Sequence, residues 1–125
     1  MSKTVQQQIL SLEREQAAAI NRGDLRGATK MFDRSLVGFS STKHESIRGL
    51  PALGRTFQHY WKRAPKMTYH IEHPQVHASG NIAIATFYWS VGLGGRRRVH
   101  GRGTHVFARK GKSWRVVHEH FSRAH

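Results

Sequence analysis

Residues near the N-terminus follow the three- and four-residue spacing of an amphipathic helix, with mostly apolar side chains on one stripe. The positions on this stripe are Val5, Ile9, Leu12, Gln16 and Ile20. Thr4, with Gln7 three residues later, is typical of a capping box at the start of a helix. We therefore predict a helix over residues 3–21.

A second, shorter helix is expected after a glycine and an aspartate. Gly23 suits the position that follows a helix, and Asp24 is a favourable N-cap for the next one. Beyond Asp33 the apolar spacing changes, and short strands are predicted around residues 36–39 and 45–48. The inward residues of the short helix are expected to be Leu25, Ala28 and Phe32.

A third helix is predicted between two prolines. Pro51 suits the first turn of a helix, and Pro65 is expected to end it. An apolar and aromatic stripe lies between them, and we expect it to pack in the core. Its residues are Leu53, Phe57, Tyr60 and Trp61.

The second half of the chain has the pattern of an antiparallel meander. Pro74 indicates a bulge or an edge strand, residues 80–81 a turn, and residues 110–112 a three-residue hairpin loop. Helices followed by long strands predict an α+β fold, with the helices on one face of a curved sheet. The expected strands cover residues 67–78, 82–93, 97–109 and 113–122.

Both faces of this sheet carry apolar side chains. Because side chains alternate along a strand, Ala85, Phe87 and Trp89 share one face, while Ile84 and Tyr88 share the other. A sheet with one face in water would be polar on that face. We therefore expect one face to pack on the helices and the other to meet a second copy, which predicts a homodimer.

The hairpin loop sets which residues face each other on the last two strands. With Gly111 at its centre, Arg102 lies opposite His120 and His105 lies opposite Val117. On that register His105 and Glu119 are diagonal neighbours on one face of the sheet.

Length and composition restrict the class of protein. At 125 residues the chain is expected to form a single domain over residues 1–125, and with no cysteine it has no thiolate chemistry. The pattern shows no membrane span and no signal peptide, so we expect a cytoplasmic protein without a membrane partner.

The charge is strongly basic, with 21 Lys and Arg against 7 Asp and Glu and a formal net charge of +14. Eight of the bases fall within residues 96–115, and no acid occurs within residues 73–118. We expect these bases to form a basic rim at one end of the sheet that attracts anionic ligands or partners. Nucleic acid is an alternative partner, not favoured because no recognition motif is present.

Three segments carry a resemblance to a known family: "PQVHASG" at 74–80, "RGTHVF" at 102–107 and "GKSWRVVHEHFS" at 111–122. They resemble the SnoaL-like and ketosteroid-isomerase-like branch of the NTF2-like superfamily, close to the association domain of calcium/calmodulin-dependent protein kinase II. The resemblance implies a cone of three N-terminal helices packed on a strongly curved, mainly antiparallel sheet. It also implies a pocket between the two layers, and dimers formed sheet to sheet.

The first candidate for chemistry is the pair His105 and Glu119. A carboxylate bound to one ring nitrogen orients an imidazole and leaves its other nitrogen as a general acid or base. Tyr88, expected on the same face, would donate a hydrogen bond to a substrate oxygen. The alternative is a buried, mutually satisfied pair with a structural role.

Four further residues are candidates for ligand binding. Tyr60 or Trp61 would form a wall of the pocket. Matching to the association domain places its pocket positions at Ser90, His105 and Phe121, so Phe121 is expected to line the pocket. Arg102 becomes an anchor for an anion if the assignment of the two faces is inverted.

His118 and His120 have a spacing that can serve a metal, but packing histidines are the favoured interpretation, and we predict neither metal nor cofactor. The favoured function is a small-molecule pocket, with the question of turnover left open. An enzyme of this kind would be a cofactor-independent isomerase, cyclase, dehydratase or hydrolase. The alternatives are a non-catalytic ligand-binding or association module, and a nonspecific binder of anions or nucleic acid through the basic rim.

Overall fold

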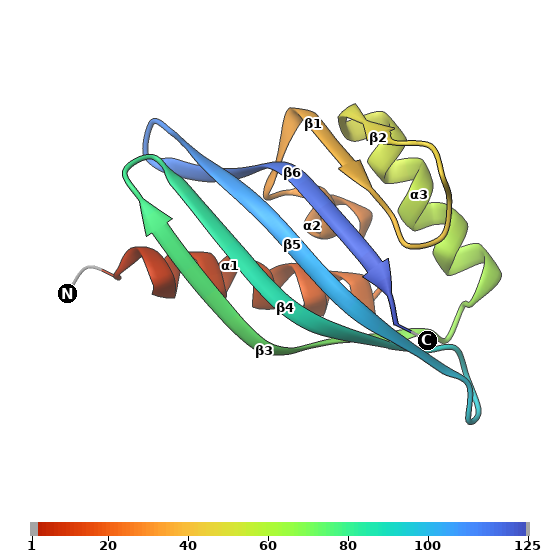
Figure 1. The fold of residues 1–125 in the computed structure, drawn as a ribbon. Coiled ribbons are helices and arrows are strands. Elements are labelled where there is room, and N and C mark those ends of the chain that lie inside the picture. The colour runs from red at the N-terminus through yellow and green to blue at the C-terminus, as the bar shows by residue number, and fades with distance from the viewer. Residues whose placement is uncertain (1–2, 125) are drawn as a thin grey trace.

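The computed structural model describes residues 3–124 and has an α+β architecture of helices packed on one sheet (Figure 1). The helices are α1 (Val5–Asn21), α2 (Leu25–Thr29) and α3 (Gly49–Arg63). The strands are β1 (Phe32–Phe39), β2 (Ile47–Arg48), β3 (Thr68–Ser79), β4 (Ile82–Gly92), β5 (Arg98–Lys110) and β6 (Ser113–Arg123). No helix among the described residues is both long enough and apolar enough to cross a bilayer.

The helix ends follow the local signals of the sequence. The Thr4 hydroxyl accepts from the Gln7 amide at 3.1 Å, and the Gln7 side chain accepts from the Thr4 amide at 2.9 Å, which confirms the capping box. The Asp24 carboxylate accepts from the Gly27 amide at 3.0 Å and caps α2. The assignment of Phe32 to this helix is wrong, because α2 ends at Thr29 and Phe32 is a buried residue of β1.

The six strands form one mixed sheet in the order β2-β1-β6-β5-β4-β3. Every neighbouring pair is antiparallel except β1 and β6, which run parallel. The pairing of β3 with β4 shifts between Glu72 and Gln75, next to Pro74, and His73 has a positive φ of 52°. The bulge predicted at Pro74 is therefore confirmed, and β3 is also an edge strand.

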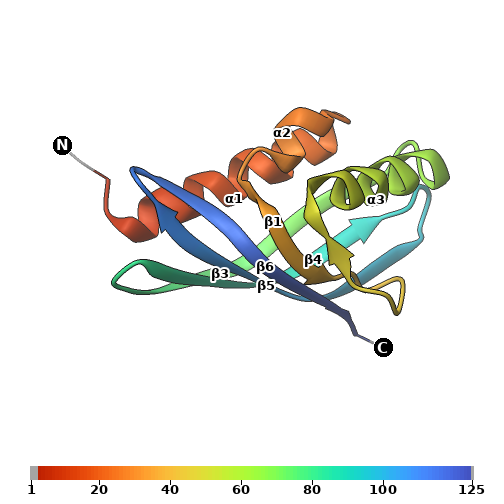
Figure 2. The same ribbon diagram turned by 90° about the horizontal axis from the view of Figure 1, so that it is seen from above.

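All three helices lie on the same side of the curved sheet (Figure 2). We call the sheet face toward the helices the inner face and the opposite face the outer face. The larger part of the core lies between α1 and the inner face, with Ile9, Phe32 and Phe107 at or below 1% exposure. Burial of each such side chain stabilises the fold by about 1.5–3 kcal/mol.

The predicted register of β5 and β6 is wrong. Lys110 pairs with Ser113, so the hairpin loop contains two residues instead of three. A second shift lies between Val106 and Phe107, which leaves Val117 as an extra residue on β6. As a result Glu119 lies directly opposite His105.

The same extra residue changes the faces of β6. Trp114 and Val116 are buried before it, and Glu119 is buried after it, although strict alternation would put Glu119 on the opposite face from Val116. His118 and His120 consequently lie on the outer face, beside Phe39. The shorter hairpin loop and the extra residue Val117 are local irregularities, and the alternation of side chains along a regular strand does not reveal them.

The predicted single basic rim is also wrong. Arg96 and Arg97 are exposed in the turn before β5, whereas Lys110 and Lys112 lie at the hairpin after it. With a rise of about 3.3 Å per residue, the length of β5 separates the two groups by roughly 40 Å. The basic residues near the two ends of β5 therefore form separate clusters at opposite ends of the sheet, and Arg102 lies between them within the strand.

Candidate functional site

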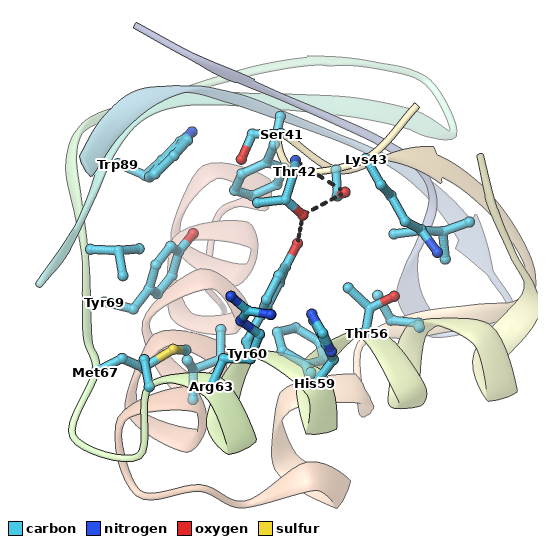
Figure 3. Close-up of a pocket in the computed structure, with 18 of the residues that line it drawn as sticks. Ser41, Thr42, Lys43, Thr56, His59, Tyr60, Arg63, Met67, Tyr69 and Trp89 are labelled. Carbon is cyan, nitrogen blue, oxygen red and sulfur yellow. Dashed lines mark hydrogen bonds between the residues drawn. The ribbon is translucent and has the colours of Figure 1, made fainter. Parts of the chain in front are cut away.

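A cavity of about 740 Å³ lies between α3, the loop of residues 40–46 and the inner face of the sheet (Figure 3). We call its buried inner end the floor, which includes Tyr69, Trp89 and Glu119. We call its exposed outer end the mouth, which includes Lys43 and the outward side chains of α3. The volume is within the usual range for small-molecule sites, about 300–1,000 Å³.

At the floor and beneath it, three ionisable side chains from three elements form one buried group. His105 Nδ1 lies 2.6 Å from Glu13 Oε2, and His105 Nε2 lies 3.0 Å from Glu119 Oε1. His105 is fully buried, and Glu13 and Glu119 are exposed by 1% and 7%. We call these three residues the charge triplet. It joins α1 to β5 and β6 through the centre of the molecule.

The two carboxylates determine the protonation state of the histidine. Burial by itself disfavours the charged imidazolium, but the charges and hydrogen bonds of Glu13 and Glu119 outweigh it and raise the pKa of His105 to about 10. At neutral pH the ring therefore carries both protons and donates one to each carboxylate. His105 has no free nitrogen to act as an acid or base.

Glu119 is the member of the triplet that reaches the cavity. Its Oε1 is held by His105, and the residue lines the floor. Gly38 on the neighbouring strand makes room for it, because a Cβ at that position would lie 2.6 Å from Glu119 Cγ. Within residues 3–124, Glu119 is the one acidic residue that lines the cavity.

Two hydrogen-bond donors on the cavity wall are buried without a partner. The Tyr69 hydroxyl and the Trp89 indole N–H have no hydrogen-bond partner among the described residues. Figure 3 shows both side chains on the wall opposite Lys43 and Thr56. Burial, with the nearby charges of Glu13 and Glu119, raises the pKa of Tyr69, so this phenol keeps its proton. Unpartnered buried donors are rare and costly, and both of these belong to residues that line the cavity.

A hydrogen bond links the two sides of the mouth. The Tyr60 hydroxyl and Thr42 Oγ1 are 2.9 Å apart, which ties the loop of residues 40–46 to α3 (Figure 3). Both groups are near solvent, so the bond is easily exchanged for water. The contact lies between two elements that line the same opening.

Three of the predicted site residues do line the cavity: Tyr60, Glu119 and Phe121. Trp61 lies beside it, where its indole N–H donates to the Ile20 carbonyl at 3.1 Å and its ring stacks on Phe57. His105 lies next to Glu119 as expected, but directly opposite and not diagonally. The prediction that one of its nitrogens is free for a substrate is wrong, because both contact carboxylates.

The placement predicted for Tyr88 is wrong. His105 pairs with Ala85 on β4, so the inner face carries the odd-numbered residues of that strand and Tyr88 points outward. Its side chain is 56% exposed. Arg102 pairs with Tyr88 and with Ser122, and is exposed on the same outer face. Neither residue reaches the cavity.

The histidine pair on β6 lies on the outer face with Phe39, whose ring centroid is 5.5 Å from that of His120. Within residues 3–124, no group of three or more His, Asp or Glu side chains has an arrangement that could hold a metal ion.

Two important residues were missed by reasoning from the sequence. Glu13 lies on the buried side of α1 between Ile9 and Gln16. An acidic residue at a position that faces the core was the signal in the sequence that could have identified it. Tyr69 is buried in an edge strand, and no local pattern distinguishes it from its neighbours. Trp89 was grouped with Ala85 and Phe87 on the face opposite Tyr88, and it was given no binding role.

Comparison with known proteins gives a family and a set of similar folds. The family model described as a SnoaL-like domain matches residues 9–125. An NTF2-like protein of unknown function from Pseudomonas putida aligns with a TM-score of 0.88 at 24% identity, over 98% of this chain and 88% of that one. The CaMKII hub of S. rosetta aligns with a TM-score of 0.86 at 23% identity, over 99% of this chain and 100% of that one.

An NTF2-like superfamily protein from Salmonella enterica serovar Typhimurium aligns with a TM-score of 0.84 at 22% identity, over 95% of this chain and 90% of that one. At these identities the three structures are evidence for the fold alone.

The charge triplet predicts a specific pH dependence. Because the pKa of His105 is raised from 6.5 to about 10, its contribution to the free energy of unfolding is complete below pH 6.5 and is lost as the pH rises through about 10. Nitrogen NMR of the ring, assigned with His105→Gln, should show a doubly protonated imidazole at pH 8.

The matched controls are two glutamates of α1. Glu13→Gln removes one carboxylate charge and should lower the pKa of His105, whereas Glu15→Gln changes an exposed residue of the same helix and should leave it unaltered. If His105 is neutral at pH 8 in the unmodified protein, its ring does not donate a proton to each of the two carboxylates, and the charge triplet as described is wrong.

Proposed function

This chain belongs to the SnoaL-like domain family, and we propose that it binds a small, largely apolar molecule in its cavity and exchanges protons with it through Glu119. The observation that carries the proposal is the position of Glu119. Its carboxylate belongs to the buried charge triplet and lines a largely apolar cavity, as do Tyr69 and Trp89, whose hydrogen-bond donors have no partner among the described residues. Apolar walls with a few convergent polar groups are typical of ligand sites.

The three polar groups of the floor have complementary roles in this proposal. Glu119 takes a proton from a carbon of the ligand and returns it to another carbon, as an isomerase requires, or to a departing hydroxyl group that leaves as water, as a dehydratase requires. Tyr69 and Trp89 donate hydrogen bonds to the ligand oxygen on which negative charge develops. His105 is a positioning residue: it holds Glu119 Oε1 and leaves Oε2 for the ligand.

The location of the binding site is tested by filling the cavity. Thr56 is half-buried on α3 and lines the cavity, whereas Gln58 is exposed on the same helix and does not. We expect the neutral dye Nile red to bind the unmodified protein and Gln58→Trp, and to lose its fluorescence gain with Thr56→Trp. Equal binding by both variants, each folded by circular dichroism, would place the dye elsewhere.

The acid–base role of Glu119 is tested with a ketone. We expect the protein to accelerate exchange of the α-protons of 2-decanone in D2O, and Glu119→Gln to reduce this rate by about 10²-fold or more. Glu72→Gln, at an exposed position of β3 outside the cavity, is the matched control and should retain the rate. If the ketone binds but Glu119→Gln exchanges as fast as the unmodified protein, Glu119 is not the base.

A second candidate function is association through the outer face of the sheet. Four apolar side chains are exposed there: Phe39 by 39%, Ile82 by 43%, Ile84 by 37% and Tyr88 by 56%. Exposed apolar groups gathered on one face are typical of protein contact surfaces. We propose that two copies pair across this face, which leaves the cavity of each copy open.

Light scattering at micromolar concentration tests the association. We expect a dimer, and we expect Ile84→Glu to give monomers because it puts a charge in the centre of the contact. Gln58→Glu adds the same charge to α3, on the other side of the molecule, and should leave the dimer intact. A monomeric unmodified protein would end this candidate function.

A further inference from the structure

The mouth of the cavity carries positive charge from two separate elements. Arg55, His59 and Arg63 recur every four residues along α3 and line the opening, and Lys43 reaches it from the loop of residues 40–46. All four side chains are exposed. Figure 3 shows His59 and Arg63 rising from α3 toward the cavity.

The three permanent cations of the mouth have no acidic partner. The ion pairs within residues 3–124 involve none of Lys43, Arg55 and Arg63. The sequence of α3 itself contains no Asp or Glu. Interaction with the helix dipole accounts for Arg63 in the last turn, but not for Arg55 near the middle of α3 or for Lys43 on another element.

The floor has the opposite sign. Its charge triplet combines two carboxylates with one imidazolium, which leaves an excess of one negative charge beneath the cavity. A ligand that carries an anion is therefore attracted at the mouth and repelled at the floor. Its position in the cavity is determined by this difference in sign.

The polar groups of the floor specify what the inner end of the ligand should carry. Glu119 Oε2 accepts hydrogen bonds, and the Tyr69 hydroxyl and Trp89 indole are donors without a partner in the described part of the chain. A hydroxyl group can donate to the carboxylate and accept from one of these donors at the same time. A second carboxylate could not, since it would be an acceptor beside an acceptor.

We propose that the natural ligand is an elongated anionic amphiphile: a carboxylate held at the mouth by Arg55, Arg63 and Lys43, an apolar body, and a hydroxyl group at the floor. This inference rests on the proposed binding function and adds the class of ligand and its direction. Arginine side chains are well suited to bind a carboxylate, because each offers two parallel N–H donors.

Three probes of equal chain length test both ends of the ligand: methyl decanoate, decanoate and 10-hydroxydecanoate. We expect decanoate to bind about tenfold more tightly than its methyl ester by calorimetry, as one charge-assisted contact would give. We expect 10-hydroxydecanoate to bind more tightly again. The first difference should shrink as salt is added, because the mouth is exposed.

Variants assign each difference to one end of the cavity. Arg55→Gln with Arg63→Gln should abolish the preference for acid over ester, and Glu119→Gln should abolish the preference for the hydroxylated acid. Arg96→Gln with Arg97→Gln removes the same charge from a turn outside the cavity and should retain both preferences.

The outcomes separate this inference from the proposed function. If the ester binds as tightly as the acid, or if Glu119→Gln strengthens binding of decanoate, the proposed direction is wrong while the cavity remains a binding site. If none of the three probes binds and Nile red does not bind either, the binding function itself is wrong.

Discussion

The contact of His105 with two glutamates is the constraint on which the rest of the structure depends. His105 and Glu13 are buried, Glu119 is buried except where it lines the cavity, and each of the three would be costly to bury alone. Together they offset much of this cost, because the imidazolium donates to both carboxylates at 2.6 Å and 3.0 Å, although Glu13 Oε1 has no hydrogen-bond partner among the described residues. Removal of His105 would leave two buried carboxylates without their cation, and loss of a buried charge partner typically costs about 3–5 kcal/mol.

This constraint also positions the site. Since Glu13 comes from α1 and Glu119 from β6, the triplet sets how the helix crosses the sheet and which oxygen of Glu119 remains for a ligand. Bulky aromatic side chains surround the imidazole, including Phe87 and Phe121 at centroid distances of 5.2 Å and 5.6 Å. Gly103 makes this packing possible, because a Cβ there would lie 2.9 Å from the Phe87 ring.

Features determined by neighbouring residues were predicted well. The capping box at Thr4, the cap at Asp24 and the bulge at Pro74 each depend on a few consecutive residues, and each is present. The faces of the last strands were predicted less well. The extra residue Val117 and a hairpin loop shorter by one residue place Glu119 directly opposite His105. On β4 the odd-numbered residues face the helices, so Tyr88 lies on the outer face.

The sequence by itself therefore determined the helices, the strands, the α+β architecture and the resemblance to the SnoaL-like family, because periodicity, caps and turns are local properties. It also singled out His105 and Glu119. Only the tertiary structure decided their roles, since Glu13 lies 92 residues from His105 in the chain and reaches it from α1, across the interface between helix and sheet. With that third group in place, the histidine is a fixed cation and the glutamate is the group that reaches the cavity. The physical reason is that burial and charge partners, which control a pKa, are set by contacts between distant segments.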